Sequence, residues 1–165
     1  RAGDLVNIDV SAELDGYFAD TGGSAIVPPE SKLHLQICAA AKKALENALL
    51  EARADAKLNR IGYAIETEAT RNGFTVIENL GSHGVGRALH EEPGFIPGYY
   101  DKSDRRILRE NQVITIEPFV SSGAREVFEN GDGWTLITNP GVFTAQYEHT
   151  LVITKGKPLI MTLTA

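Results

Sequence analysis

The residues best suited to chemistry lie in a glycine-rich stretch from Gly81 to Pro93, near the middle of the chain. The stretch holds two of the four histidines, His83 and His90, and two carboxylates follow them directly at Glu91 and Glu92. Glycines on either side of an imidazole let the backbone approach closely whatever that imidazole binds. Taken alone, the stretch fits a connector with two surface histidines about as well as it fits a functional site. The acidic residues elsewhere in the chain decide between these two interpretations.

Two aspartates lie on the two arms of a predicted hairpin. Residues 5–14 are typical of a strand, Asp15-Gly16 supplies a two-residue turn, and residues 17–21 return as the second arm. Because strands are normally poor in aspartate, Asp9 on the first arm and Asp20 on the second favour a site over an ordinary hairpin.

The turn also predicts which side chains meet across the hairpin, since it places Ser11 opposite Asp20. Asp9 shares a face with Ser11, because side chains alternate along a strand. Asp9 and Asp20 are therefore diagonal neighbours, with Cβ atoms about 7 Å apart. Two carboxylates repel each other there unless cations lie between them, and two divalent ions roughly 3.5–4 Å apart would fill the gap. The alternative is a pair of solvated aspartates on an exposed face.

A glutamate interrupts a later apolar strand, predicted over residues 112–120. Glu117 stands among β-branched residues and is followed by Pro118. An acid inside an apolar strand needs a charged partner or a metal ion, so Glu117 is a candidate ligand. The alternative is a strand that ends at Pro118 and opens to water.

The last predicted strand, residues 143–154, carries a second glutamate. Glu148 shares a polar face with Gln146, whereas the adjacent His149 points to the other face. Polar neighbours on one face can orient a ligand, so Glu148 is the better candidate of the two.

Four carboxylates and one imidazole form the candidate metal-ligand set: Asp9, Asp20, His83, Glu117 and Glu148. This hard, mostly oxygen set suits Mn(II), Fe(II), Co(II) or Zn(II), and it fits a thiolate-type structural zinc site badly. Four gathered negative charges call for two divalent cations. Such a pair lowers the pKa of a water held between the ions, producing hydroxide near neutral pH, and polarises a carbonyl. The set therefore predicts amide hydrolysis.

Two helices are predicted to position this set by packing against the strands. Ser31 or a residue just before it caps a helix over residues 32–54, whose apolar residues recur on one face. A second helix starts with Asn59 as its N-cap and stops at Asn72-Gly73. His34 is interpreted as an ordinary histidine on the polar face of the first helix.

Three further residues are interpreted without a ligand role. Cys38 is read as a small buried helix residue. Glu68 is read as a solvated charge on the second helix. Trp134 is expected in the core or in a pocket wall, with a substrate pocket as the sharper hypothesis.

Composition limits the class of protein. The 165 residues are 42% hydrophobic and carry a formal charge of -6, without a Lys/Arg cluster, so neither nucleic acid nor an anionic membrane is an expected partner. No apolar run approaches the roughly 18 residues of a membrane span, and the first four residues do not read as a signal peptide. A single cysteine excludes an internal disulfide and fits a reducing cytosol. We expect one domain over residues 1–165.

Seven segments, in order along nearly the whole chain, resemble type I methionine aminopeptidases. They are Asn7-Ile8-Asp9, Asp15-Gly16-Tyr17-Phe18-Ala19-Asp20-Thr21, His83-Gly84-Val85-Gly86, His90-Glu91-Glu92-Pro93, Thr115-Ile116-Glu117-Pro118, Asp132-Gly133-Trp134 and Ala145-Gln146-Tyr147-Glu148-His149-Thr150. Each piece is weak alone, but the ordered set is specific.

The resemblance implies an α+β pita-bread fold, in which helices cover a curved antiparallel sheet. Family members carry an upstream region, so this chain is expected to hold the C-terminal two-thirds of the fold. The resemblance also implies two divalent ions, Co, Mn, Fe or Zn, bridged by two of the ligands, Asp20 and Glu148. The implied ligands are the five of the candidate set: Asp9, Asp20, His83, Glu117 and Glu148.

The resemblance assigns roles to further residues as well. His90 is implied as a catalytic residue that contacts the substrate amide, and Glu117 as catalytic besides being a ligand. Leu89 and Trp134 are implied in the methionine pocket, although Leu89 stands where these enzymes commonly have a phenylalanine, which would reshape the pocket. Gln146 is implied as a residue that supports the ligands from behind.

The implied function is metal-dependent removal of the initiator methionine. The expected partners are nascent or newly synthesised polypeptides and the ribosome, and the expected state is a cytoplasmic monomer. Two alternatives stay open: a proline-directed aminopeptidase or dipeptidase of the same fold, and a non-catalytic pita-bread module that binds peptides. A binding module has no need to keep four mutually repelling acids together, which weighs against the second alternative.

Overall fold

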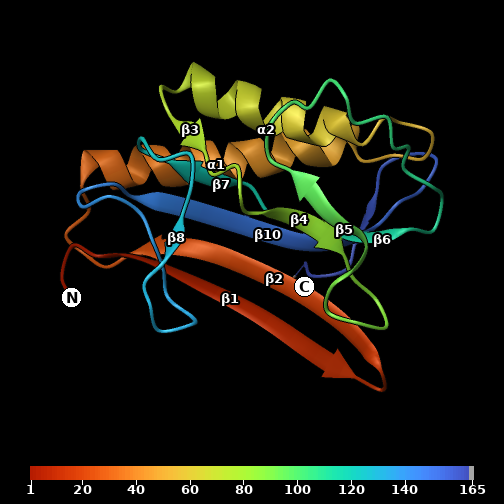
Figure 1. The fold of residues 1–165 in the computed structure, drawn as a ribbon, viewed down its shortest axis with the longest axis horizontal. Helices are drawn as coiled ribbons and strands as arrows, with labels where there is room; N and C mark the ends of the chain where they lie inside the picture. Colours follow the sequence, from red (N-terminus) through yellow and green to blue (C-terminus); the bar gives the residue numbers. More distant parts are fainter. Residues whose placement is uncertain (164–165) are drawn as a thin grey trace.

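The computed structural model describes residues 1–163, in which two helices lie on one side of a curved antiparallel sheet (Figure 1). The α+β class is therefore confirmed. The main sheet runs in the order β1-β2-β10-β6-β4-β5, with β3, β7 and β11 attached beside this path. The elements are β1 (Leu5–Leu14), β2 (Tyr17–Ile26), α1 (Lys32–Glu51), α2 (Asn59–Arg71), β3 (Thr75–Val76), β4 (Gly81–Gly84), β5 (Glu91–Pro97), β6 (Val113–Ile116), β7 (Phe119–Ser121), β8 (Phe128–Glu129), β9 (Leu136–Ile137), β10 (Thr144–Val152) and β11 (Leu159–Ile160).

The first hairpin has the predicted register. Ser11 lies opposite Asp20, and the turn residues Asp15 and Gly16 have φ angles of 53° and 79°. Both values lie in the left-handed region that a two-residue turn of this kind requires. The return strand β2 is longer than expected, because pairing with β1 continues to Ile26.

The central strand β10 pairs with strands from several parts of the chain. It pairs with β2 through Glu148 and Gly22, and with β6 through Thr150 and Thr115. A third partner, β7, pairs with the first part of β10. Strands far apart in the sequence therefore meet at β10, which lies in the middle of Figure 1.

The continuous strand predicted over residues 112–120 is wrong. The chain forms β6, leaves the ladder at Glu117 and Pro118, and resumes as β7. Proline has no N–H to donate to a ladder. The backbone N–H of Glu117 donates instead to Ser82 Oγ, at 2.9 Å. Glu117 therefore lies at the break between β6 and β7, with its N–H satisfied from β4.

The long helix α1 begins as predicted, with the Ser31 hydroxyl accepting the N–H of His34 at 3.0 Å. It ends at Glu51, a few residues before the expected end at Ala54. The N–H of Ala54 donates to the carbonyl of Thr154 at 2.8 Å, so tertiary pairing ends the helix early.

The predicted N-cap of the second helix is wrong. Leu58 is the N-cap residue, and the Asn59 side chain makes no capping bond. Its amide donates instead to the carbonyls of Asp101 and Asp104, at 2.9 and 3.0 Å. Asn59 thus ties the loop before β6 to the start of α2. The predicted stop holds, since α2 ends at Arg71 and Asn72 is the C-cap.

Two polar residues of the helices are buried, against expectation. His34 lies edge-on against Phe143, with ring centroids 4.4 Å apart. Glu68 is 7% exposed and accepts hydrogen bonds from Asn47 and Asn72 at 3.0 and 2.9 Å. Partners from α1 and from the end of α2 satisfy this acid, so it is a structural group between the helices.

The core lies between the helices and the sheet. Fully buried residues of α1, α2, β6 and β10 belong to one core cluster: Ile37, Ala41, Ala44, Ile61, Ile65, Ile114, Ile116 and Leu151. Between residues 1 and 163, neither helix combines the length and the hydropathy that a bilayer span requires.

Candidate metal centre

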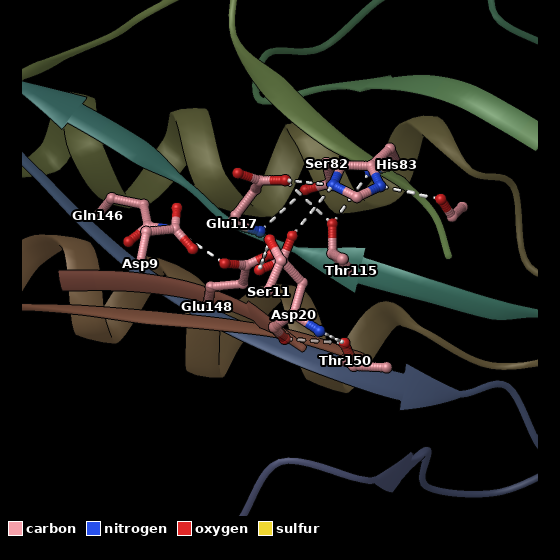
Figure 2. A network of polar contacts seen from close by, with 11 residues as sticks. Asp9, Ser11, Asp20, Ser82, His83, Thr115, Glu117, Gln146, Glu148 and Thr150 are labelled. Atoms are coloured by element: carbon pink, nitrogen blue, oxygen red, sulfur yellow. Dashed lines mark hydrogen bonds and ion pairs between the residues drawn. The ribbon is translucent and has the colours of Figure 1, made fainter. Parts of the chain in front are cut away.

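All five candidate ligands converge on one place, although four come from different strands and Glu117 comes from the break between β6 and β7 (Figure 2). Their ligand atoms form two groups, each with all atoms within 4.8 Å of one another. One group is Asp20, His83 and Glu148, and the other is Asp9, Glu117 and Glu148. Glu148 belongs to both groups, so the arrangement offers two adjoining sites that share one carboxylate.

Strand pairing explains this convergence. Asp9 and Asp20 share a face of the first hairpin, and β10 adds Glu148 beside Gly22 of that hairpin. A side chain at Gly22 has no room, because a Cβ there would lie 2.6 Å from Oε1 of Gln146. Glycine at this position lets the Gln146 side chain cross to the ligands.

His83 reaches the site from an irregular strand. The pairing of β4 with β5 shifts register between Ser82 and Gly84, which re-aims the residue between them. The N–H of His83 donates to Thr115 Oγ1 at 3.1 Å, which holds β4 against β6 at this point.

The imidazole of His83 is oriented as a metal ligand needs. Its Nδ1 lies 2.9 Å from the Gly84 carbonyl, which can only accept, so Nδ1 carries the proton. Nε2 then presents its lone pair to the cluster, 3.3 Å from Glu117 Oε1 and 3.9 Å from Asp20 Oδ2. Burial lowers the pKa of His83, which favours this neutral form.

The buried glutamates are held in an environment that disfavours their charge. Burial raises the pKa of Glu117 to about 8. Burial, and then the charges of Glu117, Asp9 and Asp20, raise the pKa of Glu148 to about 10. Without cations the cluster therefore retains protons near neutral pH.

One atom of the cluster has no partner. Glu148 is 1% exposed, and its Oε1 is buried without a hydrogen bond. A buried carboxylate oxygen without a donor is costly, and a cation would satisfy it. This orphaned atom, the Nε2 lone pair of His83 and the oxygen-rich donor set all fit divalent cations.

A shell of polar groups holds the candidate ligands. The Gln146 amide lies 3.2 Å from both Asp9 Oδ2 and Glu148 Oε2, and its carbonyl accepts from Asn7 at 2.8 Å. Gln146 thus lies behind two of the candidate ligands. Thr150 binds both the N–H and the carbonyl of Asp20, each at 2.8 Å.

Three further residues support the candidate ligands, although the sequence alone does not assign them a functional role. Ser11 donates to Asp20 Oδ1 at 3.1 Å, Thr115 donates to Glu117 Oε1 at 3.0 Å, and Asn7 holds Gln146. Asn7 and Ser11 flank Asp9 at a spacing of two, and Thr115 stands two residues before Glu117. A search for polar residues two positions from each candidate ligand would have found them, since such residues share its face.

A cleft of about 400 Å³ opens over the cluster. His90 and Leu89 line it, as their predicted roles require, and the His90 ring centroid lies 4.1 Å from that of His83. Leu80 and Phe119 add apolar walls that the sequence analysis does not anticipate. The cleft thus combines charged groups on one side with apolar groups on the other.

The core position expected for Trp134 is wrong. It is 89% exposed in the loop between β8 and β9, because this short hairpin pairs only with itself. Within residues 1–163, the groups that line the cleft over the metal-ligand cluster do not include Trp134. Its place in a substrate pocket stays a prediction.

Comparisons with known proteins show which family the chain resembles. Residues 1–155 match the sequence profile of metallopeptidase family M24. The chain is 47% identical over 163 residues to methionine aminopeptidase 2 of Bacillus subtilis, covering 98% of this chain and 65% of that relative. The chain therefore spans somewhat less than two thirds of the length of this relative.

Solved structures that share the fold include two with different activities in their names. The methionine aminopeptidase of Thermotoga maritima is 33% identical with a TM-score of 0.94, over 99% of this chain and 66% of that one. The prolidase of Pyrococcus furiosus is 25% identical with a TM-score of 0.78, over 99% of this chain and 42% of that one. The curved sheet and its two helices are thus those of a pita-bread fold. On this fold, this site and the match over residues 1–155, the chain belongs to metallopeptidase family M24.

Proposed function

We propose that the protein is a metal-dependent aminopeptidase that removes the initiator methionine from newly made polypeptides. The observation that carries the proposal is the position of Glu148, which lies in both groups of candidate ligands beneath an open cleft. The names of the relatives support methionine as the residue removed.

In this proposal the cluster holds two divalent ions, which are Co, Mn, Fe or Zn. The residues that would hold them are Asp9, Asp20, His83, Glu117 and Glu148, of which Glu148 belongs to both groups of candidate ligands. Bound ions would supply Lewis-acid polarisation of the peptide carbonyl and would lower the pKa of a bound water.

The side chains supply the remaining chemistry. Thr115 orients Glu117 through a hydrogen bond of 3.0 Å, and we assign Glu117 to accept a proton and return it to the leaving amino group. His90, exposed at the cleft beside His83, is assigned to donate to the peptide carbonyl and to the charge that develops on it.

The apolar side of the cleft suits a methionine side chain. Leu80, Leu89 and Phe119 line it, and a thioether packs well against aliphatic and aromatic groups. Trp134 would have to approach from the β8–β9 hairpin to add a further wall. The Trp134 role, the single domain over residues 1–165, the ribosome as a partner, the monomeric state and the cytoplasmic location stay predictions.

The test compares two neighbouring histidines, His83→Ala and His90→Ala, in the full-length protein. Metal stoichiometry is measured by calorimetry, and turnover is measured on a Met-Gly peptide and on an Ala-Pro peptide. We expect His83→Ala to lose metal, and His90→Ala to keep metal while turnover of the Met-Gly peptide falls by about 10²–10³-fold.

The remaining outcomes contradict the proposal in different ways. Metal loss in both variants would contradict the assignment of His83 as a metal ligand and of His90 as a hydrogen-bond donor to the substrate. Faster cleavage of the Ala-Pro peptide by the unmodified protein would favour the proline-directed alternative. A protein that binds no metal and cleaves neither peptide would be a binding module.

A further inference from the structure

The turn that carries Leu89 and His90 into the cleft has no regular structure of its own. Residues 85–90 link β4 to β5 and belong to no helix or strand. The positions of Leu89 and His90 therefore depend on contacts made elsewhere along this turn, which the proposed function does not explain.

Arg87 fastens one side of the turn to the tip of the first hairpin. Its guanidinium carbon lies 3.6 Å from the centroid of the Tyr17 ring. The same guanidinium donates to the Tyr17 hydroxyl at 2.5 Å and to the Gly16 carbonyl at 3.3 Å. Next to it, the carbonyl of Gly86 accepts the N–H of Phe18 at 2.7 Å. Four contacts thus join the turn to three consecutive residues of the hairpin.

Glu91 fastens the other side of the turn. Its Oε2 accepts the backbone N–H groups of Arg87 and Ala88, at 3.0 and 3.2 Å. A Cβ at Gly86 would lie 2.6 Å from Oε1 of Glu91, so this contact needs a glycine there. Arg87 is therefore held through its backbone by Glu91 while its side chain reaches the hairpin.

We infer that Arg87 is a positioning residue that clamps the turn to the first hairpin and so holds His90 and Leu89 across the metal-ligand cluster. The inference rests on the proposed function for its kinetic consequence. The hairpin carries Asp9 and Asp20, and the turn carries His90, so the clamp joins the two sides of the cleft. Misplacement of a reacting group by about 1 Å can cost on the order of 10²-fold in rate.

The chemistry of the contact requires arginine. A planar guanidinium can stack on an aromatic ring while its N–H groups donate to two acceptors. A lysine ammonium keeps the charge but cannot stack in this way. Arg87 and Tyr17 are both exposed, so their contact contributes little to global stability. Loss of the clamp should therefore change the turn and the kinetics without unfolding the protein.

The experiment measures the turn directly, by hydrogen–deuterium exchange of residues 85–91 in the full-length protein, with and without added Mn²⁺. We expect Arg87→Ala and Tyr17→Leu to raise exchange in this segment by about 10-fold or more, because backbone groups held by the clamp become free to open. Arg87→Lys should give an intermediate value. The matched control is Arg125→Ala, which removes another exposed arginine, paired with Glu78 at 2.7 Å.

Kinetics then test what the clamp does for the reaction. Arg87→Ala should lower kcat for Met-Gly peptides by about 10–100-fold with unchanged metal stoichiometry. The double variant with Tyr17→Leu should be no slower than the slower single variant, since both remove the same contact.

Two results would overturn the inference. Unchanged exchange in residues 85–91 of Arg87→Ala would show that Arg87 does not hold the turn. A rise in KM for long peptides alone, with normal exchange and normal kcat, would make Arg87 a direct substrate contact instead. If the unmodified protein lacks aminopeptidase activity, the proposed function fails, and the exchange experiment alone decides whether the clamp exists.

Discussion

The chain contains two hairpins with aspartate-glycine turns, and only one of them contributes to the metal-ligand cluster. The first, β1–β2, pairs over ten positions and continues into the main sheet through β10. The second, β8–β9, pairs over two positions and forms a separate sheet. Similar turn residues therefore lead to different surroundings, and the neighbouring strand makes the difference.

The acids of the two regions show what that neighbour does. Asp132, at the tip of β8–β9, accepts hydrogen bonds from the N–H groups of Trp134 and Thr135 and from the Thr135 hydroxyl, which lower its pKa to about 2. Glu148, in the main sheet, is buried among other acids, and its pKa is raised to about 10. An acid supplied with local donors supports a turn, whereas an acid deprived of donors is available to a cation.

The largest expected difference between these regions is in Mn²⁺ affinity, measured for Glu148→Gln and for Glu129→Gln. Glu129 lies on β8 and accepts the N–H of Gly133. Glu148→Gln should weaken Mn²⁺ binding by more than about 10²-fold, because loss of a candidate ligand that belongs to both groups should cost more than the 10–100-fold typical of an outer partner. Calorimetric titration measures the affinity. Equal affinities in the two variants would mean that Glu148 is not a ligand.

Added metal should stabilise the protein through the cluster. At a free Mn²⁺ concentration 100 times the Kd, each ion that binds to the folded state adds about 2.7 kcal/mol to the free energy of unfolding. Urea unfolding with Mn²⁺ and with a chelator measures the gain, and Asp132→Asn, in the other hairpin, should show the same gain. A gain that vanishes in Asp132→Asn would place the metal at the wrong hairpin.

The metal-free protein should lose stability as the pH rises from 7 to 9. The folded-state pKa values of Glu117 and Glu148 are raised from 4.5 to about 8 and about 10, so the folded protein keeps protons that the unfolded chain has lost. Their contribution is complete below pH 4.5 and falls by about 1.4 kcal/mol per pH unit for each retained proton. The lowered pKa of His83 has the opposite effect, because its contribution makes the folded protein more stable as the pH rises. This effect is confined to pH values below 6.5, the ordinary pKa of histidine.

Urea unfolding with a chelator at pH 7, 8 and 9 measures this slope. Glu148→Gln should flatten it, because one of the retained protons is gone, whereas Glu129→Gln should leave it unchanged. Stability that does not change between pH 7 and pH 9 would show that the glutamates are already charged in the folded protein.

The smallest effect is expected for Trp134→Ala. Because Trp134 is 89% exposed, the free energy of unfolding should change by less than about 0.5 kcal/mol. KM for a Met-Gly peptide, measured on the same variant, tests the predicted pocket role. A raised KM with unchanged stability would place Trp134 against the substrate, and an unchanged KM would remove it from the pocket.

Local features of the sequence predict much of this protein. The Asp15-Gly16 turn and strand alternation place Asp9 and Asp20 on one face, because turn conformation and side-chain period depend on neighbouring residues. Ser31 begins α1 for a similar reason, since its hydroxyl needs only the N–H of His34, three residues away. The seven ordered motifs also predict the family and the five candidate ligands.

Burial and irregular backbone depend on segments that are distant in sequence, so only the tertiary structure decides them. Glu68 appears solvated on its own helix, yet it is buried because Asn47 of the other helix supplies a donor. Pro118 marks the strand break at Glu117 in the sequence, but only the fold brings Ser82 of β4 to accept the N–H of Glu117. The clamp of Arg87 on Tyr17 spans 70 residues, and no pattern within either segment encodes that contact.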